Sequence, residues 1–385
     1  MSPTSYRTAL PRDVSTRELY QRDATRGDKF QHLMKTSAII LVGGEGTRLR
    51  PLTLDLPKPV VPVLDRPFLR FQLDLLRRAG IEDIVLCVAF RPERIRTVLG
   101  DGSGDRVRLT YVLEETPLGT GGAVKNAEAG LGDRVVVMNG DVLADMDLPA
   151  ILRLHDETRA AATLVLHPVE NPSAYGLVET DGQGRVQRFI EKPKPEEITT
   201  NKINAGLYVL QTRTLALMPK GVPYSIERGY FPSLIATGER VQAHTHSGYW
   251  IDIGTHRKYL QVHLDLLSRR FPHEVQATPR GSGFVHESAF VDPAAVLEGN
   301  FYVGPGCHVG PGSRIEDGAA LISNVRVLGG TVRRSVVWAE SEIGADAVVE
   351  GALLAQRVRV GRHCHVLSGS ALGDGTILSD YSRTA

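Results

Sequence analysis

Between residues 37 and 265, short apolar runs alternate with segments whose apolar side chains recur at the helical period. The runs predicted as strands are 38–42, 84–90, 108–113, 135–138 and 163–167. Residues 68–80 have apolar side chains at helical spacing and end in Ala-Gly, which predicts a glycine-capped helix, and residues 150–158 predict another. Strands that alternate with helices predict parallel βαβ units, and hence an α/β fold with a mostly parallel sheet.

The period changes after residue 283, where an aliphatic side chain recurs every six residues. The aliphatic positions are 285, 291, 297, 303, 309, 315, 321 and 327, then 337, 343 and 349, then 354, 360, 366, 372 and 378. Such a period predicts a β-helix in which each hexad forms one side of a triangular coil and points its aliphatic residue inward. The segment resembles the hexapeptide-repeat proteins, and this resemblance implies a left-handed coil.

Composition divides the chain further. Residues 1–36 mix arginines with acids and hold few apolar side chains, so we expect this tail to be mostly disordered. Residues 266–282 are rich in helix and strand breakers, which predicts a linker. The expected organisation is therefore a tail, an α/β domain over 37–265, this linker and a β-helix domain over 283–385.

Charge and cysteine content exclude several classes of protein. Lys plus Arg total 45 and Asp plus Glu total 44, giving a formal net charge of +1. This balance offers no electrostatic footprint for nucleic acid or an anionic membrane, so we expect neither as a partner. Three cysteines lie far apart, which favours a reduced, cytoplasmic setting over a disulfide scaffold. No apolar run approaches the ~18 residues of a membrane helix, so we predict no transmembrane helix.

The first predicted strand runs into a glycine turn, GGEGTR at residues 43–48. Glycines let a backbone bend and bring its N–H groups close to a phosphate. The turn is neither a Rossmann G-x-G-x-x-G, which would need glycine at Leu49, nor a P-loop, which would need lysine there. Arg48 and Lys58 follow the turn and are candidate phosphate contacts.

The wider motif resembles the signature of the sugar-1-phosphate nucleotidyltransferases. The likeness runs in order through LVGGEGTRLRPLT (41–53), PKP (57–59), PLGTGGAV (117–124), NGD (139–141), YGLV (175–178), FIEKP (189–193), NKINAGLYVL (201–210) and GYWIDIGT (248–255). With the hexad repeats it covers residues 37–380, and it is nearest to the mannose-1-phosphate guanylyltransferase group that carries a C-terminal β-helix. The resemblance implies a Rossmann-like nucleotidyltransferase domain followed by a left-handed β-helix.

The resemblance also implies a reaction: a sugar 1-phosphate attacks the α-phosphorus of a nucleoside triphosphate, here GTP with mannose 1-phosphate, and pyrophosphate leaves. Two anions must meet, so positioning and charge neutralisation carry the chemistry. Position by position, the family motifs imply catalytic roles for Arg48, Lys58 and Lys192 and nucleotide contacts by Leu41, Gly43, Gly44, Gly46, Thr47, Glu115, Gly119 and Asn139. They imply sugar contacts by Gly140, Gly176, Glu191 and Asn204, and a Mg²⁺ site formed by Asp141 and Asp252.

One residue departs from the group's motif. Guanylyltransferases of this group usually have LGTAG where this chain has LGTGG, with Gly121 in place of alanine, and the variant form also resembles heptose-1-phosphate guanylyltransferases. The alternatives are therefore heptose 1-phosphate with GTP, glucose 1-phosphate with UTP, dTTP or ATP, and a non-catalytic paralogue that senses a nucleotide sugar. The open ends and flat faces of a β-helix favour a homo-oligomer formed through that domain.

Overall fold

The computed structural model describes residues 34–191 and 193–384. Nearly all of the tail predicted as disordered lies outside these residues, and so does Lys192, whose predicted catalytic role therefore stays a prediction.

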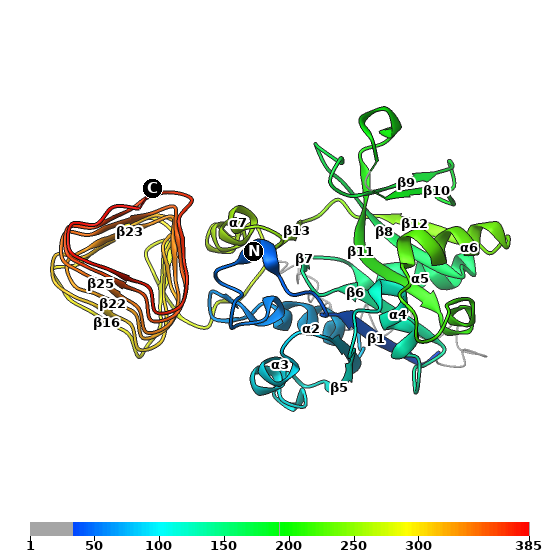
Figure 1. Cartoon of the computed structure of the whole chain (residues 1–385), viewed down its shortest axis with the longest axis horizontal. Coiled ribbons are helices and arrows are strands. Elements are labelled where there is room, and N and C mark those ends of the chain that lie inside the picture. Colours follow the sequence, from blue (N-terminus) through cyan, green and yellow to red (C-terminus); the bar gives the residue numbers. More distant parts are fainter. Residues whose placement is uncertain (1–33, 192, 385) are drawn as a thin grey trace, which may run out of the picture. The chain divides into compact units, whose positions relative to one another are not determined.

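A nine-stranded sheet forms the first domain (Figure 1). Its path is β10-β9-β11-β6-β1-β4-β5, and β8 pairs with β11 and β12. The strands are β1 (Thr36–Leu41), β4 (Asp83–Val88), β5 (Arg108–Leu113), β6 (Arg134–Asn139), β8 (Ala162–Pro168), β9 (Gly176–Thr180), β10 (Val186–Glu191), β11 (Lys202–Gln211) and β12 (Val241–Thr245). All five predicted strands are present, and β6, β1, β4 and β5 are parallel as expected. In the other half, β11 runs antiparallel to β6, β8 and β9, which the hydrophobic pattern did not predict.

Helices cover both faces of the sheet, so a central strand such as β1 is buried on both sides and its residues are almost all apolar. Ala38 and Ile40 pack into the core on one face, whereas Ile39 packs into the core on the other, and all three are 0% exposed. The first core is completed by α2 (Leu69–Arg78), α3 (Pro92–Leu99) and α5 (Leu148–Thr158), and the second by α4 (Gly119–Asn126) and α6 (Phe231–Ala236). The predicted helices 68–80 and 150–158 correspond to α2 and α5. Among the described residues, none of the helices combines the length and apolar character needed to cross a bilayer.

Short elements shape the edge of the sheet where the strands end. Two small antiparallel pairs lie there, β2 (Pro62–Val63) with β3 (Arg66–Pro67) and β7 (Val142–Ala144) with β13 (Trp250–Asp252). Short helical segments of three to six residues span Thr47–Leu49, Lys58–Val60, Ser103–Asp105, Pro195–Glu197, Thr212–Leu217 and Ile226–Tyr230.

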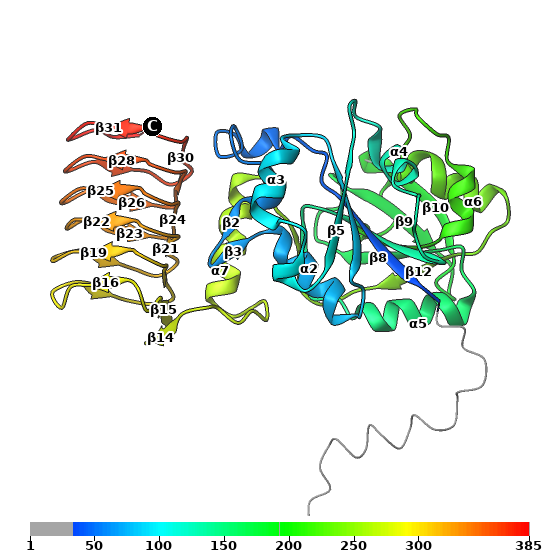
Figure 2. The same cartoon turned by 90° about the horizontal axis from the view of Figure 1, so that it is seen from below.

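The hexad segment forms a β-helix, which appears as a triangle along its axis in Figure 1 and as stacked coils in Figure 2. Its strands form three sheets, in the orders β14-β15-β18-β21-β24-β27-β30, β16-β19-β22-β25-β28-β31 and β17-β20-β23-β26-β29. Their bounds are β14 (Thr278–Arg280), β15 (Gly283–Val285), β16 (Phe290–Val291), β17 (Val296–Leu297), β18 (Tyr302–Val303), β19 (His308–Val309), β20 (Arg314–Ile315), β21 (Ala320–Leu321), β22 (Arg326–Val327), β23 (Thr331–Arg333), β24 (Val336–Val337), β25 (Glu342–Ile343), β26 (Val348–Glu350), β27 (Leu353–Leu354), β28 (Arg359–Val360), β29 (His365–Val366), β30 (Ala371–Leu372) and β31 (Ile377–Leu378). The first slip in the hexad period does not interrupt the core, because Val332 lies five residues from both Val327 and Val337 and is equally buried. The left hand of the coil stays a prediction.

The helix α7 (His256–Leu267) packs against one side of the β-helix. Its Tyr259 and Val262 share a hydrophobic core with Tyr302 and Trp338 of the coils. The indole Nε1–H of Trp338 donates to the hydroxyl of Tyr259 over 3.0 Å, and that hydroxyl donates to the carbonyl oxygen of Pro62.

The segment predicted as a linker is packed as well. Phe271 and Val275 are buried in the same core, and the imidazole of His273 contacts the carboxylate of Asp65 at 2.8 Å. Through these contacts, residues from Thr36 onward form one compact unit.

Candidate active site

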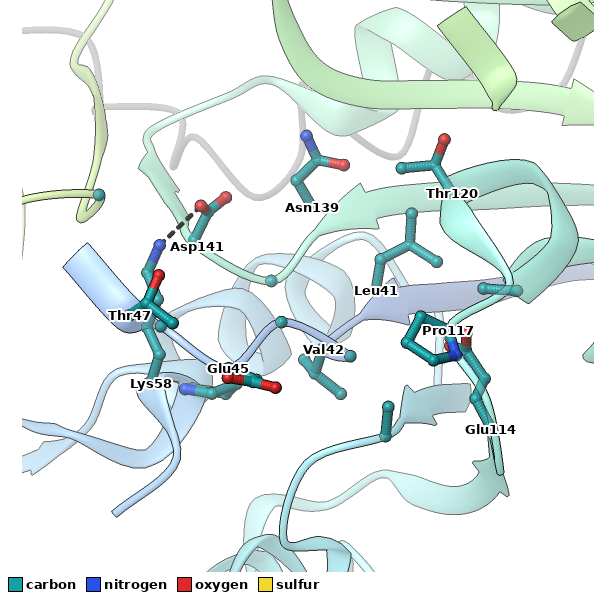
Figure 3. Close-up of a pocket in the computed structure, with 18 of the residues that line it drawn as sticks. Leu41, Val42, Glu45, Thr47, Lys58, Glu114, Pro117, Thr120, Asn139 and Asp141 are labelled. Atoms are coloured by element: carbon teal, nitrogen blue, oxygen red, sulfur yellow. Dashed lines mark hydrogen bonds and ion pairs between the residues drawn. The ribbon is translucent and has the colours of Figure 1, made fainter. Parts of the chain in front are cut away.

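A cavity of about 500 Å³ opens where β1 and β6 end, beside the glycine turn (Figure 3). Open α/β sheets place their ligand crevices at the carboxyl ends of parallel strands. The predicted site residues that line the cavity are Leu41, Gly43, Gly44, Gly46, Thr47, Arg48, Lys58, Gly119, Asn139, Gly140 and Asp141. The structure therefore gathers most of the predicted nucleotide contacts around one space.

The glycine turn gives this space an accessible backbone wall. Gly46 has φ of 66°, a left-handed conformation that favours glycine, and a Cβ built on it would lie 3.0 Å from the Cβ of Lys58. A Cβ built on Gly44 would meet no atom within 4 Å. The hydroxyl of Thr53 donates to the carbonyl oxygen of Gly46 over 2.7 Å and fixes the turn. A phosphate can therefore approach this backbone closely.

Lys58 and Asp141 form an ion pair at the mouth of the turn, marked in Figure 3. The ammonium Nζ of Lys58 donates to Oδ2 of Asp141 over 2.7 Å, and the two side chains are 11% and 33% exposed. Pro57 and Pro59 flank the lysine in a single helical turn, so its backbone has little freedom. A positive charge is thus held at the cavity before any substrate binds.

The short pair β7–β13 brings Asp252 next to Asp141, although the two are far apart in sequence. Asp252 lies opposite Val142 in this pair, and the N–H of Ile253 donates to the carbonyl oxygen of Asp141 over 2.9 Å. A Cβ built on Gly254 would lie 2.6 Å from Oδ2 of Asp252 and 3.2 Å from Nη2 of Arg48. Asp252 is not part of the cavity lining, but it lies directly next to Gly254, which lines the cavity together with Arg48 and Asp141.

Asp252 has several partners, of which the sequence predicted none. Its Oδ1 accepts hydrogen bonds from the hydroxyl of Tyr175 over 3.0 Å and from the ammonium of Lys258, and its Oδ2 accepts from the N–H of Gly254 over 3.2 Å. Burial alone would lower the pKa of Lys258, but its hydrogen bonds to Asp252 and Tyr175 outweigh this and raise the pKa. Lys258 reaches Asp252 because the backbone turns between β13 and α7. No sequence motif marks this lysine.

Two carboxylates beside a turn whose backbone a phosphate can approach suit a hard divalent cation whose other ligands are phosphate and water oxygens. Asp141 is the more open of the two, because its side chain is 33% exposed against 14% for Asp252. Within the described residues, no group of three His, Cys, Asp or Glu side chains gathers into a metal site. A cation here would thus need oxygens that the substrates bring.

The opposite wall of the cavity is built by residues 114–122. Glu114, which the sequence analysis passed over, lines the cavity and accepts a hydrogen bond from the N–H of Leu118 over 3.0 Å. Glu115, which was predicted to contact the nucleotide, is exposed, and the cavity lining contains its neighbour instead. Strand β5 ends at Leu113 and orients the buried Glu114, not Glu115, inward. The N–H groups of Gly121 and Gly122 donate to the carbonyl oxygen of Tyr224 and tie this wall to a distant segment.

The predicted sugar contacts other than Gly140 are not among the residues that line this cavity. Gly176 and Glu191 pair directly across β9 and β10, and a Cβ built on Gly176 would lie 2.6 Å from Oε2 of Glu191. Asn204 lies on β11, next to β9. These three residues form a second polar group at the far end of the sheet from β5.

A chain of hydrogen bonds connects this second group to the cavity. The amide Nδ2 of Asn204 donates to the hydroxyl of Tyr208 over 2.6 Å, and this hydroxyl donates to Oε1 of Glu227 over 3.2 Å. The hydroxyl of Thr120, which lines the cavity, donates to Oε2 of Glu227 over 2.8 Å. The sequence analysis missed Glu227, although the preceding Ser225, an N-cap serine, marks the start of a helical turn there.

Comparisons with known proteins find family models and relatives that are similar to this chain. The family model described as "Nucleotidyl transferase" matches residues 37–269, and the one described as "GMPPB C-terminal domain" matches residues 280–383. A Mycobacterium tuberculosis protein named mannose-1-phosphate guanylyltransferase is 40% identical over 77% of this chain and 83% of its own length. An Arabidopsis thaliana protein named probable mannose-1-phosphate guanylyltransferase 2 is 35% identical over 90% of this chain and 98% of its own length.

A solved structure is also similar to this chain. HddC from Yersinia pseudotuberculosis, complexed with GMP-PN, superposes with a TM-score of 0.52 at 26% identity, covering 60% of this chain and 99% of that protein.

Proposed function

The chain belongs to the nucleotidyl transferase family, and from this premise we propose that it transfers GMP from GTP to mannose 1-phosphate, giving GDP-mannose and pyrophosphate. The names of the relatives from M. tuberculosis and A. thaliana support this choice of substrates. The observation that carries the proposal is the single cavity shared by the glycine turn, Arg48, Lys58 and Asp141.

In the proposed reaction, an oxygen of the sugar phosphate attacks the α-phosphorus of the triphosphate. The bond from that phosphorus to the oxygen bridging to the β-phosphate breaks, and pyrophosphate carries away the electron pair. The backbone of residues 43–47 and the planar guanidinium of Arg48 hold the triphosphate, since such a fork can bind two phosphate oxygens. Lys58, which Asp141 holds at the cavity, contributes positive charge where the two anions meet.

We propose Asp141 and Asp252 as the ligands of a divalent cation, Mg²⁺. When bound, such an ion neutralises phosphate charge and orients the reacting oxygens. The remaining assignments are also proposals: Asn139 and Gly119 contact the nucleotide, and Gly140, Gly176, Glu191 and Asn204 contact the sugar.

The test is a matrix of nucleoside triphosphates and sugar 1-phosphates, with release of pyrophosphate as the signal. GTP with mannose 1-phosphate should give the highest kcat/KM. A higher value for UTP with glucose 1-phosphate, or for GTP with heptose 1-phosphate, would reassign the substrates. Absence of pyrophosphate release with every pair would instead favour a nucleotide-sugar sensor.

We also propose that the protein is a cytoplasmic homo-oligomer assembled through its β-helix. Light scattering coupled to size exclusion should then give a mass that is a multiple of the chain mass of 42.0 kDa. A particle of the chain mass at micromolar concentration would contradict the oligomer.

A further inference from the structure

We propose that Lys258 is a built-in competitor of the divalent cation at Asp252, so that this lysine sets how tightly the free protein binds the metal. The inference rests on the proposed metal site of Asp141 and Asp252. It concerns a residue that neither the glycine turn nor the predicted catalytic set includes.

The position of Lys258 is fixed by its backbone. It lies in the first turn of α7, where its N–H donates to the capping hydroxyl of Thr255 over 3.3 Å. From there its ammonium reaches back to Oδ1 of Asp252 and to the hydroxyl of Tyr175, and it lies 5.0 Å from the centre of the Tyr175 ring. The ion pair with Asp252, the hydrogen bond to the Tyr175 hydroxyl and the contact with the Tyr175 ring therefore all hold the ammonium at the carboxylate.

A metal ion that binds Asp252 must either take Oδ1, which these groups occupy, or bind Oδ2, which accepts the N–H of Gly254, beside the ammonium of Lys258. Both the ammonium of Lys258 and the hydroxyl of Tyr175 donate to Oδ1 of Asp252. A divalent cation binds carboxylate oxygens at about 2.0–2.6 Å, so it has to displace the ammonium or lie next to a like charge. The side chains of Lys258 and Asp252 are only 26% and 14% exposed, so water screens this repulsion weakly.

The competition should be stronger at Asp252 than at Asp141. Lys58 contacts only Oδ2 of Asp141, whose side chain is one-third exposed. Lys258 instead shares its oxygen with a second donor, and the carboxylate that it contacts is the more buried of the two, 14% exposed against 33%. A bare cation is thus disfavoured in the free protein, whereas one that arrives with phosphate oxygens brings an anion for the displaced ammonium.

The experiment measures Mn²⁺ binding to the full-length protein without substrates, by the electron paramagnetic resonance signal of free Mn²⁺. Lys258→Met should lower the Kd for Mn²⁺ about tenfold, the change expected for 1.4 kcal/mol. Arg257→Met is the matched control, because it removes the same charge from an exposed neighbour on the same helix, and its Kd should stay within about twofold. Asp252→Asn should raise the Kd at least about tenfold.

The outcomes separate the inference from the proposal on which it rests. An unchanged or higher Kd in Lys258→Met, together with weaker binding in Asp252→Asn, would overturn the role of Lys258 and keep the metal site. An unchanged Kd in Asp252→Asn would overturn the metal site itself. Lys258→Gln keeps a neutral donor for the carboxylate and provides a second variant, which should also bind Mn²⁺ more tightly. In both lysine variants, Mn²⁺ should raise Tm by more than it does in the natural protein.

Discussion

Replacement of Gly121 by alanine would restore the residue that the related guanylyltransferases usually have, yet we expect it to destabilise this protein. A Cβ at position 121 would lie 2.8 Å from Cδ1 of Tyr224 and 3.2 Å from the backbone nitrogen of Ile226. The ring of Tyr224 cannot simply move away, since a Cβ built on Gly229 would lie 2.6 Å from two of its carbons. The ring is therefore confined between two glycine backbones.

Two opposing effects set the size of the change. Overpacking of a confined side chain typically costs about 1–3 kcal/mol. Alanine in place of glycine in a helix gains at most about 1 kcal/mol, and Gly121 lies in the first turn of α4. The net loss in the free energy of unfolding should thus be about 1 kcal/mol. In a Tyr224→Ala background the ring is absent, so the loss should vanish.

Urea denaturation of the natural protein, both single variants and the double variant tests this reasoning. The coupling free energy between positions 121 and 224 should be about 1–3 kcal/mol, because the overpacking exists only when both side chains are present. Gly121→Ala should also raise the KM for the nucleoside triphosphate, since the first turn of α4 lines the cavity. An equal effect of alanine in both backgrounds, or a stabilised single variant, would refute the argument.

Three further predictions concern catalysis, pH and packing. Asp141→Asn should lower kcat about 10²–10³-fold in the pyrophosphate assay, the usual scale for losing one preorganised electrostatic partner, and an unchanged kcat would rule out the proposed metal role of Asp141. Burial lowers the pKa of His155 and of His263 to about 4. Because the folded state then binds fewer protons than the unfolded state, the free energy of unfolding should fall as the pH falls, by about 3 kcal/mol per histidine between pH 6.5 and 4. Urea midpoints across this range measure the fall, and His155→Gln should reduce the slope; a slope unchanged in that variant would contradict the assignment. Trp338→Phe should lower the free energy of unfolding by about 2 kcal/mol, because the Tyr259 hydroxyl loses a buried donor and the core loses volume, and a Tm equal to that of the natural protein would contradict this packing.

The parallel half of the sheet and the coils of the β-helix were predictable because their signals are local. A buried parallel strand needs an unbroken apolar run, and each hexad needs one inward aliphatic side chain, as Ile40 and Ile315 show. The antiparallel half was not predictable in the same way. The direction of β11 relative to β6 depends on the path of the connections between the two strands, so it cannot be predicted from the residues of β11 alone.

The same distinction applies to the candidate site, where residues contiguous in sequence were predictable and residues brought together by folding were not. The glycine turn with Arg48 is contiguous in sequence, so its chemistry is visible before folding. Lys258 reaches Asp252 through the local turn between β13 and α7, whereas Glu227 reaches Thr120 through a tertiary contact. Neither a lone lysine nor a lone glutamate has a sequence pattern that marks it. The pairing of Asp141 with Asp252 was available through the family resemblance alone, because β7 and β13 meet only in the fold.

Helix α7 serves both halves of the chain, and this constrains how the halves can be exchanged between relatives. Its first turn carries Lys258 to the active site, while the next residue, Tyr259, packs on Trp338 in the coils. A chimera that takes the β-helix of a relative from a junction after α7 would pack this tyrosine against coils that did not evolve with it. A junction placed ahead of Thr255 would transplant the helix together with its coils, but it would also exchange the lysine. Recombination of the two modules should therefore alter the chemistry of the cavity even when every residue of the glycine turn is retained.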